Sequence, residues 1–198
     1  MLKATLVAGF LMSAASMAAA QEECVKITNP DDRLNCFDHS FKTSETVQTE
    51  SEWMVKVDKS KLDDTTSVVM SVQSTDEVRG KFGGATKGSL FIRCQENKTS
   101  LFIVWADNFM SDIQGRGRVD YRIDDRTAKK VNMENSTDHM ALGLWSGGNS
   151  IPFIKDMYEA SSLYVRATPF SESPIEMTFN ISGIEEASKP LREACGWK

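Results

Sequence analysis

The sequence has 198 residues, of which 40% are hydrophobic and 26% are charged, and its formal net charge is −5. This length fits one ordinary globular domain, and the apolar fraction excludes an intrinsically disordered chain. A surface that binds nucleic acid needs clustered positive charge, so the acidic balance argues against nucleic acid as a partner.

The first 20 residues have the pattern of a secretory signal peptide. Lys3 gives a basic start, residues 4–12 form an apolar run, and an Ala-rich stretch ends at Ala20. The apolar run is too short to span a membrane, which needs about 20 residues, and the Ala-x-Ala ending is typical of a cleavage site. We therefore expect an exported protein without a membrane span.

Export decides how the four cysteines are interpreted. In an oxidising compartment, an even number of cysteines predicts disulfides. Cys24 and Cys36 are the easiest pair to close, which leaves Cys94 with Cys195, and this pairing is favoured over the other two. A metal site would need Cys-x2-Cys spacing or nearby histidines, and neither occurs. We expect no metal and no cofactor.

A short helical element is predicted over residues 24–41. Asn29 can cap it and Pro30 suits the first helical position. Residues 42–52 lack apolar periodicity and predict a polar linker. Residues 21–52 are therefore interpreted as a disulfide-closed N-terminal helix followed by a linker.

From Trp53 onward the apolar residues recur with a period of two, which predicts β-strands. About eight short strands separated by turns indicate an antiparallel β-sandwich or a barrel-like sheet over residues 53–198. Glu96-Asn97-Lys98 predicts a hairpin turn. Short helices are expected at 151–160 and at 184–195, where Pro190 kinks or splits the second helix. The predicted strands lie at residues 53–57, 68–72, 90–92, 101–105, 119–123, 140–145, 163–168 and 175–181.

A search for catalytic motifs finds no Gly-x-Ser-x-Gly, no His-Glu-x-x-His and no phosphate-binding glycine loop. The two histidines, His39 and His139, are interpreted as surface or capping residues. We therefore expect no catalytic residue. A pair of carboxylates distant in sequence, as glycosidases use, is kept as an alternative.

Three arginines lie inside predicted strands: Arg93, Arg122 and Arg166. Such residues are typical of an outer sheet face on which cross-strand carboxylates, here Asp120 or Asp124, stabilise the arginines. The alternative is a basic patch that binds an anionic partner. The tryptophans could line a sugar-binding surface, although their positions favour the core. The candidate binding face consists of Arg93, Arg122, Asp124, Arg166 and Trp105.

Several blocks of the sequence together resemble the type VI secretion system-associated VasI/TagO family. Cys24 with residues 33–38 (RLNCFD) is similar to the N-terminal signature of the family, and the C-terminal block ends in Ala194-Cys195-Gly196-Trp197. The order and spacing of the blocks match over essentially the whole chain after the signal peptide. The other matching blocks are Trp53 with residues 60–64, residues 90–94 (LFIRC) with 97–99 and Trp105, residues 121–124 (YRID), and residues 163–170 (LYVRATPF).

The resemblance implies an exported accessory protein of Gram-negative bacteria that acts in the periplasm and has no assigned catalysis. Its expected partner is a protein of the cell envelope, such as a component of the secretion apparatus. Relatives also occur outside secretion gene clusters, in prophage regions among others. The leading hypothesis is a non-enzymatic interaction protein associated with type VI secretion. The alternatives are a peptidoglycan hydrolase and a carbohydrate-binding sandwich.

Overall fold

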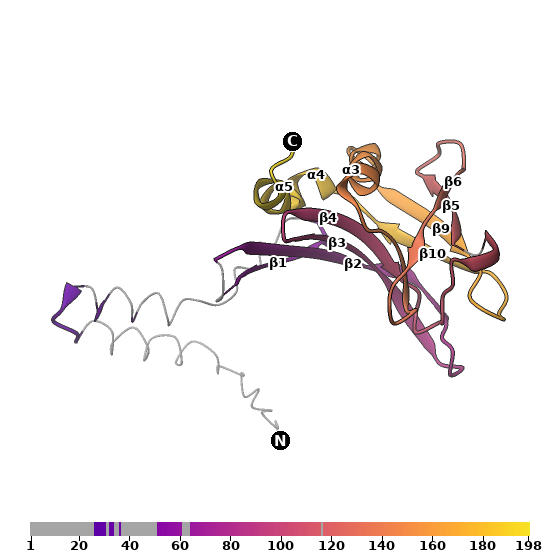
Figure 1. Ribbon diagram of the computed structural model, residues 1–198, viewed down its shortest axis with the longest axis horizontal. Helices are drawn as coiled ribbons and strands as arrows, with labels where there is room; N and C mark the ends of the chain where they lie inside the picture. The colour runs from indigo at the N-terminus through magenta and orange to yellow at the C-terminus, as the bar shows by residue number, and fades with distance from the viewer. Residues whose placement is uncertain (1–25, 31, 34–35, 37–50, 61–63, 116) are drawn as a thin grey trace, which may run out of the picture. The chain divides into compact units, whose positions relative to one another are not determined.

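The computed structural model describes residues 26–30, 32–33, 36, 51–60, 64–115 and 117–198 (Figure 1). These residues belong to two units, with the boundary between residues 43 and 44. The predicted signal peptide and Cys24 lie outside the described residues. The Cys24–Cys36 disulfide and the domain boundaries therefore stay predictions.

In the first unit, Pro30, Asp32, Arg33 and Cys36 are helical. Asn29 caps this turn, because its backbone carbonyl accepts a hydrogen bond from the Arg33 amide (3.0 Å) and its side-chain oxygen accepts one from the Asp32 amide (3.5 Å). The predicted cap at Asn29 is confirmed, but residues 26–29 are not helical, so the helix begins later than residue 24. Most of the remaining residues of the predicted 24–41 helix lie outside the described part of the chain.

The second unit is mainly β, as predicted, and all strand pairs are antiparallel. Each predicted strand is present, and the left-handed residues Glu96 (φ 50°) and Asn97 (φ 57°) form the predicted hairpin turn. The strands are β1 (Met54–Lys59), β2 (Thr66–Arg79), β3 (Ala85–Gln95), β4 (Lys98–Val104), β5 (Arg118–Ile123), β6 (Lys129–Asn132), β7 (Glu134–Asn135), β8 (Ala141–Leu144), β9 (Ser162–Ala167) and β10 (Ile175–Asn180). A short 3-10 turn, η1 (Ile113–Gly115), precedes β5.

The strands form a nearly closed, barrel-like sheet. The pairing order is β6-β5-β9-β10-β2-β3-β4-β8-β7, and β1 pairs with the first half of β2. The two ends of this order, β6 and β7, are separated in the chain by Met133 alone. The sheet therefore closes almost completely around its core, which is the barrel-like form of the predicted architecture.

β2 joins the two halves of the sheet at Ser74, which pairs with Phe179 of β10. The ladder between β2 and β3 is irregular between Gln73 and Glu77. Polar side chains replace the missing backbone partners there: the Ser74 hydroxyl accepts a hydrogen bond from the Gly88 amide (3.0 Å), and the Asp76 carboxylate accepts one from the Thr178 amide (3.0 Å). Such irregularities bend a strand and let a sheet curve.

The core consists of the side chains that point inward from alternate strand positions. Leu101, Ile103 and Trp105 all point inward and are fully buried. Trp105 therefore belongs to the core, and its predicted place on a binding face is wrong. The physical reason is the strand period, because Trp105 has the same parity as Leu101 and Ile103.

Three helices lie together beside the strands (Figure 1). The predicted helix at 151–160 is α3, at Gly147–Asp156, so it begins earlier than expected. The predicted C-terminal helix is split in two, as Pro190 suggested: α4 (Ile184–Ala187) and α5 (Lys189–Cys195). None of the helices in the described part of the chain is long and apolar enough to cross a membrane.

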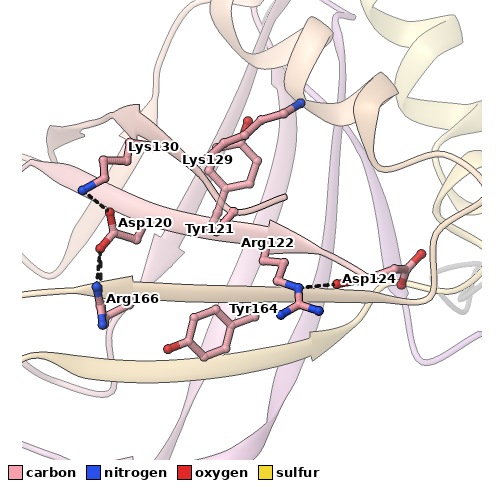
Figure 2. A pocket seen from close by; sticks show the side chains of 9 residues that line it. Asp120, Tyr121, Arg122, Asp124, Lys129, Lys130, Tyr164 and Arg166 are labelled. Carbon is pink, nitrogen blue, oxygen red and sulfur yellow. Dashed lines mark hydrogen bonds and ion pairs between the residues drawn. The ribbon is translucent and has the colours of Figure 1, made fainter. Parts of the chain in front are cut away.

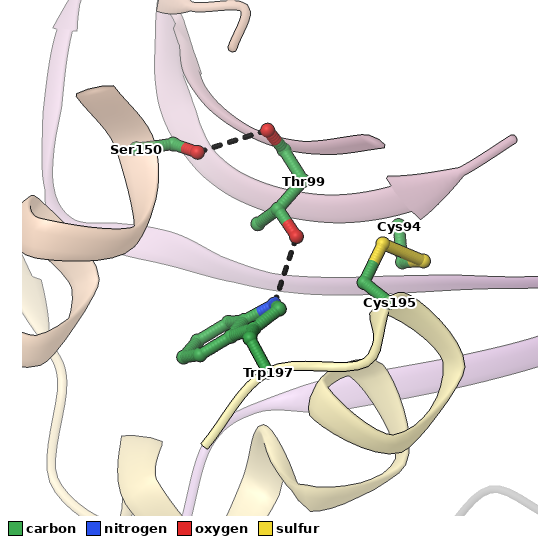
Figure 3. Close-up of a disulfide and its surroundings, with 5 residues drawn as sticks. All are labelled: Cys94, Thr99, Ser150, Cys195 and Trp197. Carbon is green, nitrogen blue, oxygen red and sulfur yellow. Dashed lines mark hydrogen bonds between the residues drawn. A yellow bond between two sulfur atoms is a disulfide. The ribbon is translucent and has the colours of Figure 1, made fainter. Parts of the chain in front are cut away.

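A disulfide fixes the C-terminal helix to the sheet (Figure 3). Cys94 of β3 is bonded to Cys195 of α5, with a Cα–Cα distance of 5.8 Å, which confirms this predicted pair. Beside it, the Trp197 indole donates to the hydroxyl of buried Thr99 (2.8 Å), and the Ser150 hydroxyl of α3 donates to the Thr99 carbonyl (2.9 Å). The end of the chain, α3 and β4 therefore meet at Thr99.

Replacing both Cys94 and Cys195 by Ala is expected to lower the free energy of unfolding by about 2–5 kcal/mol, because the bond closes a loop with a sequence separation of 101 residues. Urea unfolding under non-reducing conditions measures the change. Trp197→Phe is the comparison, since it keeps a ring and removes one hydrogen bond worth about 1 kcal/mol. An unchanged unfolding midpoint in the double cysteine variant would contradict the structural role of the bond.

Candidate functional site

Charged and aromatic side chains surround a hollow of about 560 Å³ on the outer face of β5, β6 and β9 (Figure 2). The strand period explains this placement. In β5, buried Val119 and Ile123 point toward the core, so Asp120 and Arg122 between them point outward. We call this surface the β5–β9 face, and it consists of Asp120, Arg122, Asp124, Lys130, Tyr164 and Arg166.

A row of alternating charges crosses four neighbouring strands of this sheet. In register, Lys130 of β6 lies opposite Asp120 of β5, Asp120 lies opposite Arg166 of β9, and Arg166 lies opposite Glu176 of β10. The shortest nitrogen–oxygen distances along the row are 3.3, 2.8 and 3.9 Å. Opposite charges at directly paired positions stabilise a sheet, so this row is the cross-strand ladder that the strand arginines predict.

Arg122 contacts the turn that follows β5. Its Nε donates to the backbone carbonyl of Asp124 (3.0 Å), and its Nη2 donates to the carboxylate of Asp125 (3.1 Å). The Arg122 side chain is nevertheless 47% exposed. Its guanidinium is thus held in one orientation while much of it still faces solvent.

Asp124 links β5 to the start of β9. One oxygen of its carboxylate accepts hydrogen bonds from the amides of Ser161 (3.0 Å) and Ser162 (2.8 Å) and from the Ser162 hydroxyl (3.2 Å). Asp124 also adopts a left-handed backbone conformation (φ 45°), which Asp tolerates better than most residues. Its main contribution is to shape the site.

The electrostatics of the site keep its carboxylates ionised. The hydrogen bond from Arg166, helped by Lys130, lowers the pKa of Asp120, and the Ser162 amide lowers the pKa of Asp124. Asp120 in turn raises the pKa of Arg166. Burial, followed by the Glu176 carboxylate, raises the pKa of Tyr164. At neutral pH the face therefore offers fixed anions and cations, and Asp120 and Asp124 have no proton to donate.

The structure brings together Arg122, Asp124 and Arg166, but it separates them from Arg93. Arg93 lies on β3, in the other half of the sheet, and lines a different hollow. Sequence reasoning missed Lys130 and Tyr164 as members of the face. Tyr164 could have been found from its alternation with Leu163 and Val165, whereas Lys130 lies on a strand that the sequence did not predict.

The described residues contain no group of three histidine, cysteine or carboxylate side chains that could hold a metal ion. The chemistry available on the β5–β9 face is ionic and hydrogen-bonded recognition, through half-exposed guanidinium groups and fixed carboxylates.

Replacing Asp120 by Asn is expected to reduce the acid sensitivity of the protein. The folded-state pKa of Asp120 lies below its ordinary value of about 3.9. Its ion pairs therefore add stability above the unfolded-state pKa, and this stability is lost as the pH falls through the folded-state pKa. Urea midpoints measured between about pH 5 and pH 2 should fall less steeply for Asp120→Asn than for the wild type.

Asp125→Asn is the matched control, because this carboxylate is fully exposed and, among the described residues, is bound by Arg122 alone. Equal pH slopes for the wild type and Asp120→Asn would show that the ladder contributes nothing to stability.

Comparison with known proteins gives a family for the chain. The family model described as "Type VI secretion system VasI, EvfG, VC_A0118" matches residues 23–197. A comparison with curated proteins finds no match. Among solved structures, the crystal structure of invasion associated protein B from Bartonella henselae is similar with a TM-score of 0.45 and 10% sequence identity, over 74% of this chain and 95% of that chain. Because the family model covers nearly the whole sequence, the chain belongs to the VasI family of type VI secretion system proteins.

Proposed function

We propose that this VasI family member is a non-enzymatic accessory protein that binds a protein partner of the cell envelope through the β5–β9 face. It would be exported by a cleavable signal peptide at residues 1–20 and act in the periplasm. Family membership supports an association with type VI secretion. The Cys94–Cys195 disulfide indicates an extracytoplasmic location, because such bonds persist in oxidising compartments.

The observation that carries the proposal is the fixed row of charges on adjacent strands. Binding is weakened when flexible side chains must first be ordered, so groups already held in place lose less entropy. Asp120 holds Arg166 through two nitrogens at 3.2 and 2.8 Å, and Arg166 is still 48% exposed. A planar guanidinium presented in this way suits a carboxylate or a backbone carbonyl of a protein partner.

The carboxylates of the site favour recognition over hydrolysis. A glycosidase needs a general acid whose pKa is raised so that it carries a proton at working pH. The pKa values of Asp120 and Asp124 are shifted the other way. One oxygen of each carboxylate is also bound by arginine or backbone donors, which holds the side chain in place for recognition.

Replacing Arg122 by Glu is expected to weaken type VI-dependent secretion strongly while leaving the fold stable. Arg122 makes exposed contacts, which are worth at most about 1 kcal/mol, but the change reverses the charge at the centre of the face. Secretion by a strain that carries only the variant measures function, and the thermal midpoint of the purified protein measures folding.

Lys189→Glu is the matched control, because Lys189 is an exposed cation on α5, with an ion pair to Glu186 three residues away. Equal secretion by the two variants would contradict the β5–β9 face as the binding surface. Release of soluble fragments when the purified protein is incubated with cell-wall sacculi would contradict the non-enzymatic part of the proposal.

A further inference from the structure

A second hollow, of about 450 Å³, lies on the outer face of β3, β4 and β8. We call it the Arg93 groove, and it is lined by Arg93, Phe102, Trp145, Thr137 and Asp138, among others. It shares no residue with the β5–β9 face. Its size falls within the range of about 300–1,000 Å³ that is usual for small-molecule sites.

One wall of the groove is aromatic and fixed. The rings of Phe102 and Trp145 are stacked, with centroids 5.3 Å apart, and Phe91 stacks behind Phe102 at 5.0 Å. Gly143 makes this stack possible, because a Cβ atom there would lie 2.8 Å from both the Phe102 Cβ and the Trp145 ring. The Trp145 indole donates its hydrogen bond to the Glu134 carbonyl (3.0 Å). The ring is therefore held in place, with its own polar group already bonded.

The cation of the groove is not neutralised by the described part of the protein. The Arg93 guanidinium lies over the Phe102 ring, 5.5 Å from its centroid. Among the described residues, no carboxylate lies within ion-pair distance of it, and its Nε is buried without a hydrogen-bond partner. Its cross-strand neighbours are Val69 and Ser100, neither of which carries charge. Arg122 and Arg166, in contrast, each have a carboxylate partner.

Residues 135–138 form a polar rim that lines the same hollow as the Arg93 guanidinium and the aromatic wall. The rim is ordered by its own hydrogen bonds: the Asp138 carboxylate accepts from the Ser136 hydroxyl (2.5 Å) and from the Met140 amide (3.1 Å). These bonds lower the pKa of Asp138, so it is an acceptor at neutral pH. Asp138 and the Thr137 hydroxyl line the same hollow as Arg93.

The aromatic wall, the Arg93 guanidinium and the polar rim together determine which kind of ligand the groove can bind. Aromatic side chains pack well against a flat apolar surface. An arginine without a partner favours a carboxylate, and an ionised Asp138 favours hydroxyl donors and disfavours a phosphate or a strongly acidic peptide. The geometry points to a binding site for a sugar ring that carries one carboxylate, held between Trp145 and Arg93. This site would act independently of the partner-binding face.

N-acetylmuramic acid and N-acetylglucosamine form a matched pair of probes, because the first differs from the second by a lactyl ether that carries a carboxylate. We expect the exported protein to bind N-acetylmuramic acid about ten-fold more tightly, which is the usual effect of a charge-assisted hydrogen bond. Titration followed by NMR, with the Trp145 indole resonance as reporter, gives both affinities and the location of binding.

Arg93→Gln should remove the preference for the acidic sugar, so that the two sugars bind the variant with similar affinity. Trp145→Leu should weaken both, and Trp145→Phe provides a ring-preserving variant if the Leu variant does not fold. Lys189→Gln is the control for loss of one positive charge elsewhere. The inference would be overturned by equal affinities for the two sugars in the wild type, by a preference that survives Arg93→Gln, or by resonance shifts confined to the β5–β9 face. If the Arg93 groove does not bind the acidic sugar, the expected secretion phenotype of Arg122→Glu is unaffected. The proposals for the Arg93 groove and for the β5–β9 face are therefore tested independently.

Discussion

β2 passes from one half of the sheet to the other, and the irregularity between Gln73 and Glu77 is the point at which it bends. Before the bend it pairs with β1, and at Ser74 it pairs with β10. Gly88 of β3 lies at the same corner, where a Cβ atom would collide with the Met177 side chain and the Val104 carbonyl. The close approach of these strands therefore needs both the Ser74 hydroxyl and a residue without a side chain.

This bend determines where function can be placed on the molecule. Because the sheet almost closes, most inward positions are used by the core, and recognition falls mainly to the outward positions. The two halves present their outward positions as separate surfaces. β5, β6 and β9 carry the charged β5–β9 face, while β3, β4 and β8 carry the aromatic Arg93 groove. The Cys94–Cys195 disulfide and the hydrogen bond from Trp197 to Thr99 fix the C-terminal helix to the same sheet.

The sequence predicted the strands well, because alternation such as that of Val119, Tyr121 and Ile123 is a local signal. It could not predict β6, since Lys129-Lys130 and a single valine do not form an alternating apolar pattern. Short, lysine-rich segments of this kind are typical of edge strands. Because β6 was not predicted, the contact between Lys130 and Asp120 could not be predicted either. Trp105 was misplaced because both faces of its strand look apolar in the sequence, and only its parity with Leu101 and Ile103 decides its direction.

The three strand arginines show most clearly what depends on strand order. In the sequence, Arg93 and Arg166 look alike, since each follows an apolar residue inside a strand. In the folded protein, Arg166 has Asp120 and Glu176 as its cross-strand neighbours, whereas Arg93 has Val69 and Ser100. Arg166 is therefore part of a ladder, whereas Arg93 has no carboxylate partner in the part of the chain that the structure describes. Strand order depends on contacts between residues far apart in the sequence. A single sequence therefore gives no direct information about it.

Photo-crosslinking in living cells tests the central claim, that the β5–β9 face binds a partner in the envelope, most directly. Ala128 lines the hollow of this face and is exposed, so it can be replaced by a photoreactive amino acid, with exposed Ser173 as the control position. We predict one discrete adduct from position 128 that is absent from position 173 and is lost when Arg122→Glu is added. The same adducts from both positions, or an adduct at position 128 that persists with Arg122→Glu, would contradict the account.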